Sequence, residues 1–259
     1  MRFVGKVAIV TGGASGIGAA FARRLHGEGG SVMIADLDAK QGAELAKSLG
    51  ERAAFQQVDV ADPAALQALA EATVSAFGGI DILYNNAGIG CYGLTPDLAI
   101  EDWRRVIAVN LDAVFYGGKP VTPPLRAGGG GAITNPASAS GLQADYGFTA
   151  YNAAKAGVIN YTRSLAIDHA RDAIRANAIC PGPVDTPILT TGVDAIQGLR
   201  AEWEGVVPMK RFAQADEIAA VAAFLASDDA SCVTGVAIPV DGGLTAHTGQ
   251  PDLRDRMGG

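Results

Sequence analysis

Short apolar runs alternate with longer stretches of helical periodicity along most of the chain. The runs predict seven strands, at residues 6–10, 31–35, 54–58, 81–84, 132–135, 175–179 and 236–240. The stretches between them place apolar residues at helical spacing and predict helices over 19–27, 38–49, 63–77, 102–115, 150–170 and 216–225. Strands joined by helices pair in parallel and are covered on both faces, so their residues are almost continuously apolar. We therefore expect one doubly wound α/β domain over residues 1–259, with helices on both faces of a seven-stranded, mostly parallel sheet.

The composition fits a protein with a large core and narrows the choice of partners. Of the 259 residues, 49% are hydrophobic and 18% are charged, which leaves no compositional case for disorder. The net charge of −7 disfavours nucleic acid, because a phosphate backbone requires a basic surface. No stretch approaches the ~20 apolar residues that span a bilayer, and the first residues do not resemble a signal peptide. We expect a cytoplasmic protein with no membrane partner.

The cysteines and histidines lie far apart in the sequence, three of each. The odd number of cysteines and their wide spacing predict free, buried thiols and no bound metal.

A glycine-rich segment connects the first predicted strand to the first predicted helix. It reads Thr-Gly-Gly-Ala-Ser-Gly-Ile-Gly over residues 11–18. Such glycines let the backbone turn sharply and approach a pyrophosphate, and the helix directs its N-terminal amides and positive dipole end at that anion. The position between strand and helix is typical of a dinucleotide site, whereas glycines alone would form only a tight turn.

Asp36 ends the second predicted strand, 18 residues after Gly18. A carboxylate at this position accepts hydrogen bonds from the adenosine ribose hydroxyls and repels a 2′-phosphate. Leu37 follows it, and positions 14, 15 and 37 hold no Arg or Lys to bind a phosphate. These residues favour NAD over NADP as the cofactor; the alternative is that Asp36 is only a turn residue.

The glycine spacing G-x-x-x-G-x-G resembles the short-chain dehydrogenase/reductase family, and further motifs follow in that family's order. They are Asp59-Val60, Asn85-Asn86-Ala87-Gly88, Asn110, Ser138 separated by twelve residues from Tyr151-x-x-x-Lys155, and Pro181-Gly182. Together they cover nearly the whole chain. The resemblance implies a three-layer Rossmann-like fold with the active site at the carboxyl ends of the strands. It also implies which residues contact the cofactor: Gly12, Ser15, Gly16, Ile17, Gly18, Asp36, Leu37, Asp59, Val60, Asn86, Ala87, Gly88, Tyr151, Lys155, Pro181, Gly182, Val184 and Thr186.

Three prolines fall where the helix that contains Asn110 should continue. Pro120, Pro123 and Pro124 are interior positions of that helix, and an interior proline costs ~3 kcal/mol or more. We expect the helix to kink, to end early, or to place these prolines where a kink is tolerated. The family frequently forms homotetramers and often uses this helix for dimer contacts, so a tetramer is expected and a dimer is the alternative.

Tyr151 and Lys155 are four residues apart on a predicted helix and therefore share a face. A tyrosine with its ordinary pKa of about 10 is a poor base at neutral pH, but a nearby ammonium stabilises the phenolate. Tyr151 can then exchange a proton with an alcohol or a carbonyl oxygen. By resemblance, Lys155 also binds the nicotinamide ribose, Ser138 holds the substrate oxygen, and Asn110 organises a water that relays protons.

Two features leave the details of the site open. Ser140 is an alternative to Ser138, because the two serines are separated by one alanine. Pro136 and Ala137 precede Ser138 where the family usually has an apolar residue and a small or hydroxyl residue, so the loop that carries the serine could differ in shape.

The expected substrate residues are mostly apolar. Leu142, Gln143, Tyr146 and Phe148 lie between Ser138 and Tyr151, and Trp203 lies in an apolar segment, about 186–211, that we expect to form a lid. Together with Ser138, they favour a medium-sized, largely apolar alcohol or ketone; the alternative is that several of them simply pack the lid.

The sequence therefore predicts an oxidoreductase that transfers a hydride between NAD(H) and a secondary alcohol or ketone. The first alternative is a 3-oxoacyl-acyl-carrier-protein reductase, which would prefer NADPH and a basic surface for its acidic carrier. The second is a non-catalytic nucleotide sensor on the same fold, which would be expected to lack Tyr151 or Lys155.

Overall fold

Seven strands form the central sheet of the computed structural model, which describes residues 1–250. The strands are β1 (Val7–Thr11), β2 (Ser31–Asp36), β3 (Ala53–Gln57), β4 (Ile82–Tyr84), β5 (Gly131–Pro136), β6 (Ile174–Pro181) and β7 (Ala237–Val240). Their order is β3-β2-β1-β4-β5-β6-β7, and every neighbouring pair is parallel. The predicted doubly wound sheet is confirmed, and it is parallel throughout rather than mostly parallel. Residues 251–259, the end of the predicted domain, lie outside the described residues.

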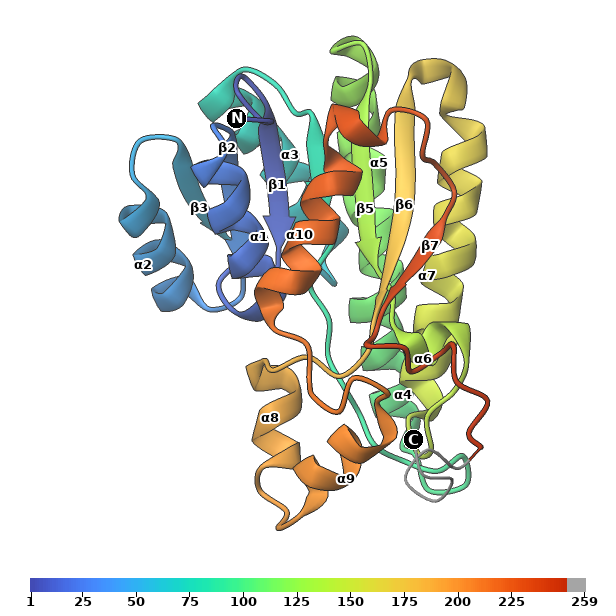
Figure 1. Ribbon diagram of the computed structural model, residues 1–259. Helices are drawn as coiled ribbons and strands as arrows, with labels where there is room; N and C mark the ends of the chain where they lie inside the picture. Colours follow the sequence, from blue (N-terminus) through green and yellow to red (C-terminus); the bar gives the residue numbers. More distant parts are fainter. Residues whose placement is uncertain (251–259) are drawn as a thin grey trace.

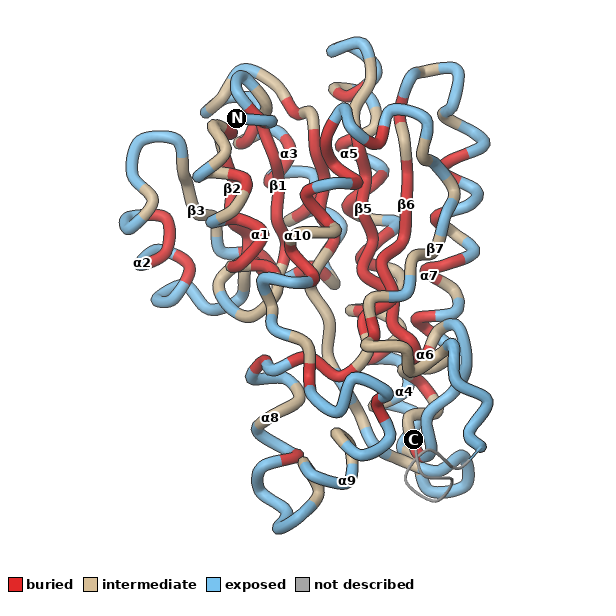
Figure 2. The backbone as a smooth tube through the Cα atoms, viewed as in Figure 1, coloured by how far each residue is buried: buried red, intermediate tan, exposed pale blue. Residues whose placement is uncertain are grey.

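Helices cover both faces of the sheet (Figure 1). α1 (Gly16–Gly27), α2 (Ala39–Leu49) and α10 (Ala215–Ala226) bury their apolar residues in one core cluster. α3 (Pro63–Phe77), α5 (Ala113–Ala127) and α7 (Thr149–Asp168) contribute to the cluster on the opposite face. Buried residues follow the strands and the inner faces of these helices (Figure 2). The three-layer arrangement is thus the one that alternating strands and helices predict.

The strand order reverses beside β1, because the chain runs outward from β1 to β3 and then returns to form β4 on the other side. In open α/β sheets, ligands bind outside the carboxyl ends of the strands at such a switch point. At this end of the sheet lie the short helices α4 (Ile100–Ile107), α6 (Ala139–Leu142), α8 (Pro187–Val193) and α9 (Leu199–Val206), as Figure 1 shows. Short 3₁₀ turns occur at Ala170–Asp172 and Asp228–Ala230.

The helix predicted over 102–115 is wrong in both its extent and its regularity. α4 leads into a π-helical turn, Ala108–Asp112, and α5 then runs through all three prolines to Ala127. The helix does not end early, because α5 buries Val121 and Leu125 in the core cluster on this face of the sheet. Tertiary packing therefore outweighs the local cost of the prolines.

Two further expectations from the sequence can be compared with the structure. Cys180 is buried and Cys91 is half-buried, but Cys232 is exposed, so the expectation of three buried thiols is wrong for Cys232. Among the helices of residues 1–250, none combines the length and the apolar character needed to cross a membrane.

Candidate active site

The loop between β1 and α1 has the backbone that a pyrophosphate site requires. Gly12 and Gly16 have φ angles of +57° and +51°, in the left-handed region that favours glycine. A side chain on Gly12 would meet the Cα atom of Ala87 at 2.8 Å, and one on Gly18 would collide with the Gly12 carbonyl oxygen. Ser15 is the N-cap of α1, and Ile17 in the first turn packs against the core. The first N–H groups of a helix have no intrahelical partner, so this loop fits an anionic ligand.

Asp36 stands beside this loop at the end of β2. Its two carboxylate oxygens accept hydrogen bonds from the Ala14 N–H and from the N–H two residues after Asp36, both at 3.0 Å. Each oxygen keeps a further acceptor position for a diol. Leu37 is 63% exposed. After β3, the Asp59 carboxylate accepts a hydrogen bond from the Ala61 N–H, and Val60 is buried.

The segment after β4 is tied to the same glycine loop. Asn86 Nδ2 donates to the Gly12 carbonyl at 2.8 Å, and the Ala87 N–H donates to Thr11 Oγ1 at 3.2 Å. The carboxyl ends of β1 and β4, on either side of the switch point, are therefore joined by side-chain hydrogen bonds.

The segment after β6 approaches this loop as well. A side chain on Gly16 would contact Thr186 Cγ2 at 3.3 Å, and Thr186 is buried. Pro181 ends β6, a side chain on Gly182 would collide with Asp241, and Val184 is buried. The predicted cofactor residues thus gather at the carboxyl ends of β1, β2, β3, β4 and β6.

Tyr151 and Lys155 lie on the same side of α7, as their spacing predicts. Lys155 is 4% exposed; its Nζ donates to the Pro136 carbonyl at 2.8 Å and lies 5.5 Å from the centre of the Tyr151 ring. Pro136 is the last residue of β5 and continues its pairing with β6 opposite Ile179. The proline therefore extends the strand and supplies the carbonyl that holds the lysine.

Ser138 follows β5 and is the N-cap of α6. Its Oγ accepts from the Ser140 N–H at 3.1 Å and donates to Ser140 Oγ at 3.0 Å. The Ser138 hydroxyl also lies close enough to the Tyr151 hydroxyl to lower the pKa of Tyr151. Of the two serines, Ser138 lies against Tyr151, and Ser140 lies behind it, 5% exposed.

The π-helical turn places Asn110 against this cluster. Ala113 N–H bonds the carbonyl of Ala108, five residues back, as the wider turn requires. Asn110 Nδ2 donates to the carbonyls of Val106 and Ile89 at 3.0 and 2.9 Å, and its Oδ1 accepts from the Ile89 N–H at 3.2 Å. A side chain on Gly88 would meet Asn110 Oδ1 at 2.8 Å and Lys155 Nζ at 3.7 Å. Gly88 therefore keeps the space between these two groups open.

Burial dominates the electrostatics of the cluster. It raises the pKa of Tyr151; the hydrogen bond with Ser138 opposes this rise, and the Asp145 charge adds to it. Burial also lowers the pKa of Lys155 to about 8. The sequence predicts that the ammonium lowers the Tyr151 pKa, but desolvation, which disfavours the charged form of both groups, dominates here.

Aromatic rings form one wall beside Tyr151. The Phe148 ring stands edge-on to Tyr151, with centroids 6.4 Å apart, and edge-on to Tyr92, with centroids 5.9 Å apart. The segment that carries Tyr92 is held by a hydrogen bond from the Gly93 N–H to the Gly147 carbonyl at 2.7 Å. The sequence reasoning missed Tyr92, since no motif marks it.

The other predicted substrate residues are more dispersed. Leu142 is 37% exposed and Tyr146 is 98% exposed. Gln143 Nε2 donates to the Thr245 carbonyl at 3.4 Å, and the Trp203 ring stands edge-on to Phe212 at 6.4 Å. Their role in substrate binding stays a prediction.

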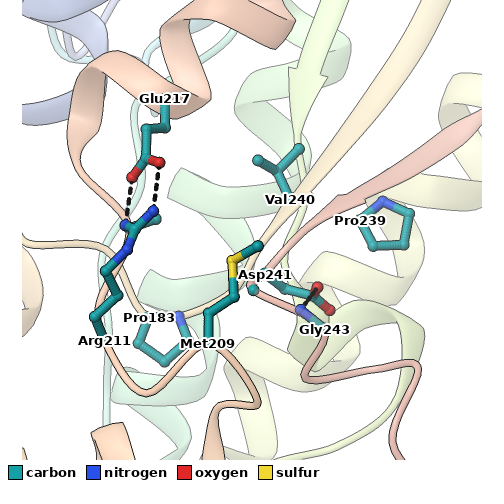
Figure 3. A pocket seen from close by; sticks show the side chains of 10 residues that line it. Pro183, Met209, Arg211, Glu217, Pro239, Val240, Asp241 and Gly243 are labelled. Atoms are coloured by element: carbon teal, nitrogen blue, oxygen red, sulfur yellow. Dashed lines mark hydrogen bonds and ion pairs between the residues drawn. The ribbon is translucent and has the colours of Figure 1, made fainter.

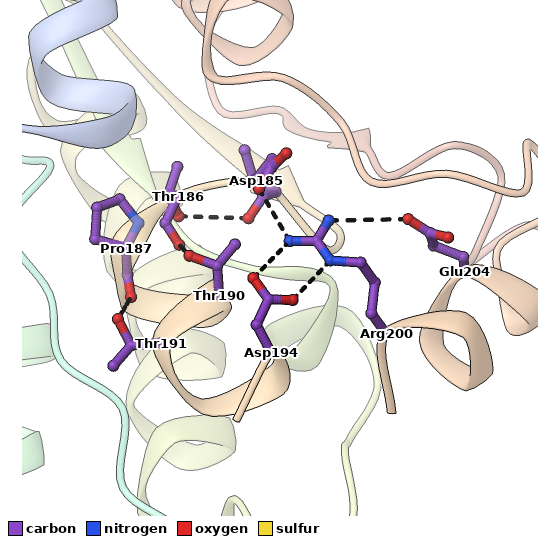
Figure 4. A network of polar contacts seen from close by, with 9 residues as sticks. Asp185, Thr186, Pro187, Thr190, Thr191, Asp194, Arg200 and Glu204 are labelled. Atoms are coloured by element: carbon purple, nitrogen blue, oxygen red, sulfur yellow. Dashed lines mark hydrogen bonds and ion pairs between the residues drawn. The ribbon is translucent and has the colours of Figure 1, made fainter. Parts of the chain in front are cut away.

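Arg200 holds the segment of α8 and α9 together (Figure 4). Its guanidinium bonds both oxygens of Asp194, at 2.7 and 3.0 Å, and Asp185 at 3.2 Å. It also lies 4.8 Å above the centre of the Phe212 ring. These charges are partly exposed, so each pair contributes little, but together they tie the segment to the chain just after β6.

A cavity of about 310 Å³ lies at the carboxyl end of β7. Figure 3 shows Met209 and Pro183 on its wall, with the Arg211–Glu217 ion pair at 2.7 Å beside them. Ser138, Tyr151 and Lys155 do not line it. The cavity therefore belongs to the base of the α8–α9 segment rather than to the tyrosine cluster.

Comparisons with known proteins show which families and structures this chain resembles. A family model described as "Enoyl-(Acyl carrier protein) reductase" matches residues 12–245. The chain is 42% identical to meso-2,3-butanediol dehydrogenase of Serratia marcescens, over 98% of this chain and 100% of that protein. It is 41% identical to cyclohexanol dehydrogenase of Acinetobacter sp. (strain SE19), over 95% and 97%. The crystal structure of levodione reductase superposes with a TM-score of 0.91 at 36% identity, over 95% of this chain and 99% of that one.

The chain belongs to the short-chain dehydrogenase/reductase family. It is an oxidoreductase of secondary alcohols and ketones with a nicotinamide cofactor.

Proposed function

We propose that this enzyme transfers a hydride between NAD(H) and a medium-sized, largely apolar secondary alcohol or ketone, with Tyr151 as its proton-transfer residue. The observation that carries this proposal is the cluster of Ser138, Tyr151 and Lys155 at the carboxyl ends of the strands, in which Ser138 and Lys155 are buried and Tyr151 is partly buried. Lys155 is held by the Pro136 carbonyl, and the Ser138 hydroxyl lies beside Tyr151. Such a cluster can orient an oxygen and exchange one proton with it.

Each residue has a separate part in this proposal. A bound nicotinamide supplies or accepts the hydride. Tyr151 accepts the proton of an alcohol or donates one to a carbonyl oxygen, and Ser138 orients that oxygen. Lys155 binds the nicotinamide ribose hydroxyls and exchanges protons with Tyr151. Asn110, beside Gly88 and Lys155, positions a water on the path to solvent.

The substrate class is supported by the aromatic wall and by the relatives. Phe148 and Tyr92 present ring faces and edges next to Tyr151, and such surfaces favour apolar carbon skeletons. The relatives named above act on butanediol, cyclohexanol and levodione. A panel of cyclohexanol, meso-2,3-butanediol and 1-butanol, followed by absorbance of the reduced cofactor, tests the proposal. Oxidation of a secondary alcohol faster than of 1-butanol is expected, and a preference for 1-butanol would contradict it.

A carrier-bound 3-ketoacyl substrate is the second candidate, since the matching family model is described by a carrier-protein reaction. The net charge of −7 opposes docking of an acidic carrier. Reduction of a 3-ketoacyl thioester with NADPH, measured beside the alcohol panel, distinguishes the two.

The position of Asp36 predicts the cofactor preference. Its carboxylate can accept from a ribose diol, and a 2′-phosphate at the same place would meet a like charge. We expect kcat/KM with NAD⁺ to exceed that with NADP⁺ by at least about tenfold, equivalent to ~1.4 kcal/mol. The double change Asp36→Ala with Leu37→Arg should narrow or invert this ratio. Equal use of both cofactors by the unmodified enzyme would contradict the assignment.

We also propose a homotetramer with closed symmetry, the usual kind of assembly for a soluble homo-oligomer. Two large apolar side chains, Trp103 on α4 and Phe115 on α5, are 39% and 48% exposed. Light scattering at micromolar concentration should give about four times the chain mass. A dimer would mean that the proline-containing helix has lost one interface, and a monomer would refute the proposal.

A further inference from the structure

A row of hydrogen bonds leads from Ser138, beside Tyr151, to a carboxylate that the family motifs do not include. Ser138 Oγ donates to Ser140 Oγ at 3.0 Å, and Ser140 Oγ donates in a short hydrogen bond to Asp145 Oδ2. Three side chains are thus connected in sequence, and the first of them, Ser138, acts on the pKa of Tyr151. The row begins beside the proposed proton-transfer group and ends at an exposed residue.

The backbone around Asp145 is fixed by a residue next to Tyr151 on α7. Asn152 Nδ2 donates to the Asp145 carbonyl at 2.9 Å, and Asn152 Oδ1 accepts from the Asp145 N–H at 3.3 Å. The amide thus holds both polar groups of the Asp145 backbone. The carboxylate therefore keeps its place relative to the tyrosine, although it lies on the loop between α6 and α7.

The carboxylate determines the direction of the hydrogen bonds. An ionised carboxylate only accepts, so the single Ser140 proton is directed to Asp145. Ser140 Oγ can then only accept from Ser138, whose own proton is directed toward Ser140. As a result, the Ser138 hydroxyl is held in one position beside Tyr151.

We propose that Asp145 is a positioning residue for the alcohol–ketone reaction, orienting the Ser138 hydroxyl through Ser140. The proposal rests on the proposed function, because it assigns Ser138 and Tyr151 to that reaction. Ser140, which the sequence offers as an alternative to Ser138, then has the role of linking Asp145 to Ser138.

The negative charge of Asp145 gives the proposal a second, independent readout. In addition to Asp145, the titratable groups of this region come from several elements. Lys155 on α7 lies over the Tyr151 ring, and Cys91 after β4 packs against the same hydrophobic cluster as Tyr151. Cys180 on β6 interacts with Lys155, and Asp241 after β7 interacts with Cys180. Among all these groups, Asp145 is the one whose charge raises the pKa of Tyr151. Removing that charge should move the rise of alcohol oxidation to lower pH, by roughly half a unit for one partly solvated charge nearby.

Three variants distinguish the orientation of the Ser138 hydroxyl from the effect of the Asp145 charge on Tyr151. Ser140→Ala keeps the backbone N–H that bonds Ser138 and keeps the Asp145 charge, but removes the linking hydroxyl. It should lower kcat roughly threefold to tenfold, the loss of about one hydrogen bond, without moving the midpoint of the pH profile. Asp145→Asn keeps an acceptor for Ser140, so it should move the midpoint down and lose less turnover than Asp145→Ala. Asp145→Ala should show both effects.

The matched control is Asp168→Asn, which removes the same charge about 25 Å along α7 from Tyr151. The experiment measures kcat for cyclohexanol oxidation against pH, with NAD⁺ titrations of each variant by calorimetry to verify folding. A midpoint for Asp145→Asn equal to that of Asp168→Asn, or unchanged kcat in Ser140→Ala, would refute the role of Asp145. The variant Tyr151→Phe in the same assay tests the proposed function separately, because it removes the proton-transfer group itself.

Discussion

Replacing Tyr151 by Phe should reduce the turnover of alcohol oxidation by ~10² or more, the usual scale for losing a general acid or base. The change removes one hydroxyl, which lies beside Ser138, and keeps the ring that packs against Phe148. Folding and cofactor binding should therefore survive. Steady-state kinetics with cyclohexanol and calorimetric titration with NAD⁺ measure the two quantities on the same protein.

Tyr161→Phe is the matched control, because it makes the same change on the same helix. Burial raises the pKa of Tyr161 to about 12, and its ring stands edge-on to Phe115 on α5, outside the cluster of Ser138 and Lys155. This variant should keep its turnover. If Tyr151→Phe retained most of the activity, the proposed mechanism would be wrong.

The fold could be predicted from the sequence because its local signals agree with one another. The apolar runs locate all seven strands to within about two residues; the first is expected at 6–10 and found at Val7–Thr11. Asp62 caps α3 with a hydrogen bond to the Ala64 N–H, and Pro63 begins that helix, as the preference for proline in the first turn predicts.

The region from Ile100 to Ala127 could not be predicted in this way. Its local signals favour an early end, but burial of Val121 and Leu125 stabilises a helix that contains prolines. The π-helical turn that presents Asn110 depends on contacts with the Ile89 backbone, 21 residues away in the sequence. Helix propensities describe local sequence only and do not include such long-range contacts.

In the candidate site, too, some features follow from local sequence signals and others depend on long-range contacts. Spacing alone places Tyr151 and Lys155 on one face of α7, and the glycine motif falls where strand and helix predict it. Asp145 is different: its contact with Ser140 depends on a loop conformation that Asn152 fixes through its side chain. The only sequence signal was an acidic residue between Ser138 and Tyr151, and such residues are common in exposed loops.

Replacing Lys155 should affect both the chemistry and the cofactor, because its ammonium has two roles in the proposal. We expect Lys155→Ala to lower kcat by roughly 10², as for the loss of an acid–base partner, and to weaken NAD⁺ binding about tenfold, the scale of a hydrogen bond to a charged group. Lys155→Met, which fills more of the buried space, should show the same losses. If only the alanine variant lost activity, the lysine would be important for packing alone.

The pH dependence follows from the burial that lowers the pKa of Lys155 to about 8 and raises that of Tyr151. We expect the two groups to titrate as a coupled pair, so that the measured midpoint belongs to both. Alcohol oxidation requires the pair to accept a proton, and its rate should rise from neutral to alkaline pH as the pair loses one. Ketone reduction requires the protonated pair and should fall over the same range.

The Lys155 variants should lose this midpoint or move it, while the exposed Lys119→Ala should keep it. Profiles of kcat in both directions, recorded for the unmodified enzyme and the three variants, measure the effect. Identical midpoints in the unmodified and Lys155→Met enzymes would show that the lysine does not take part in the titration. In that case Tyr151 would have to exchange its proton through Ser138 or directly with solvent.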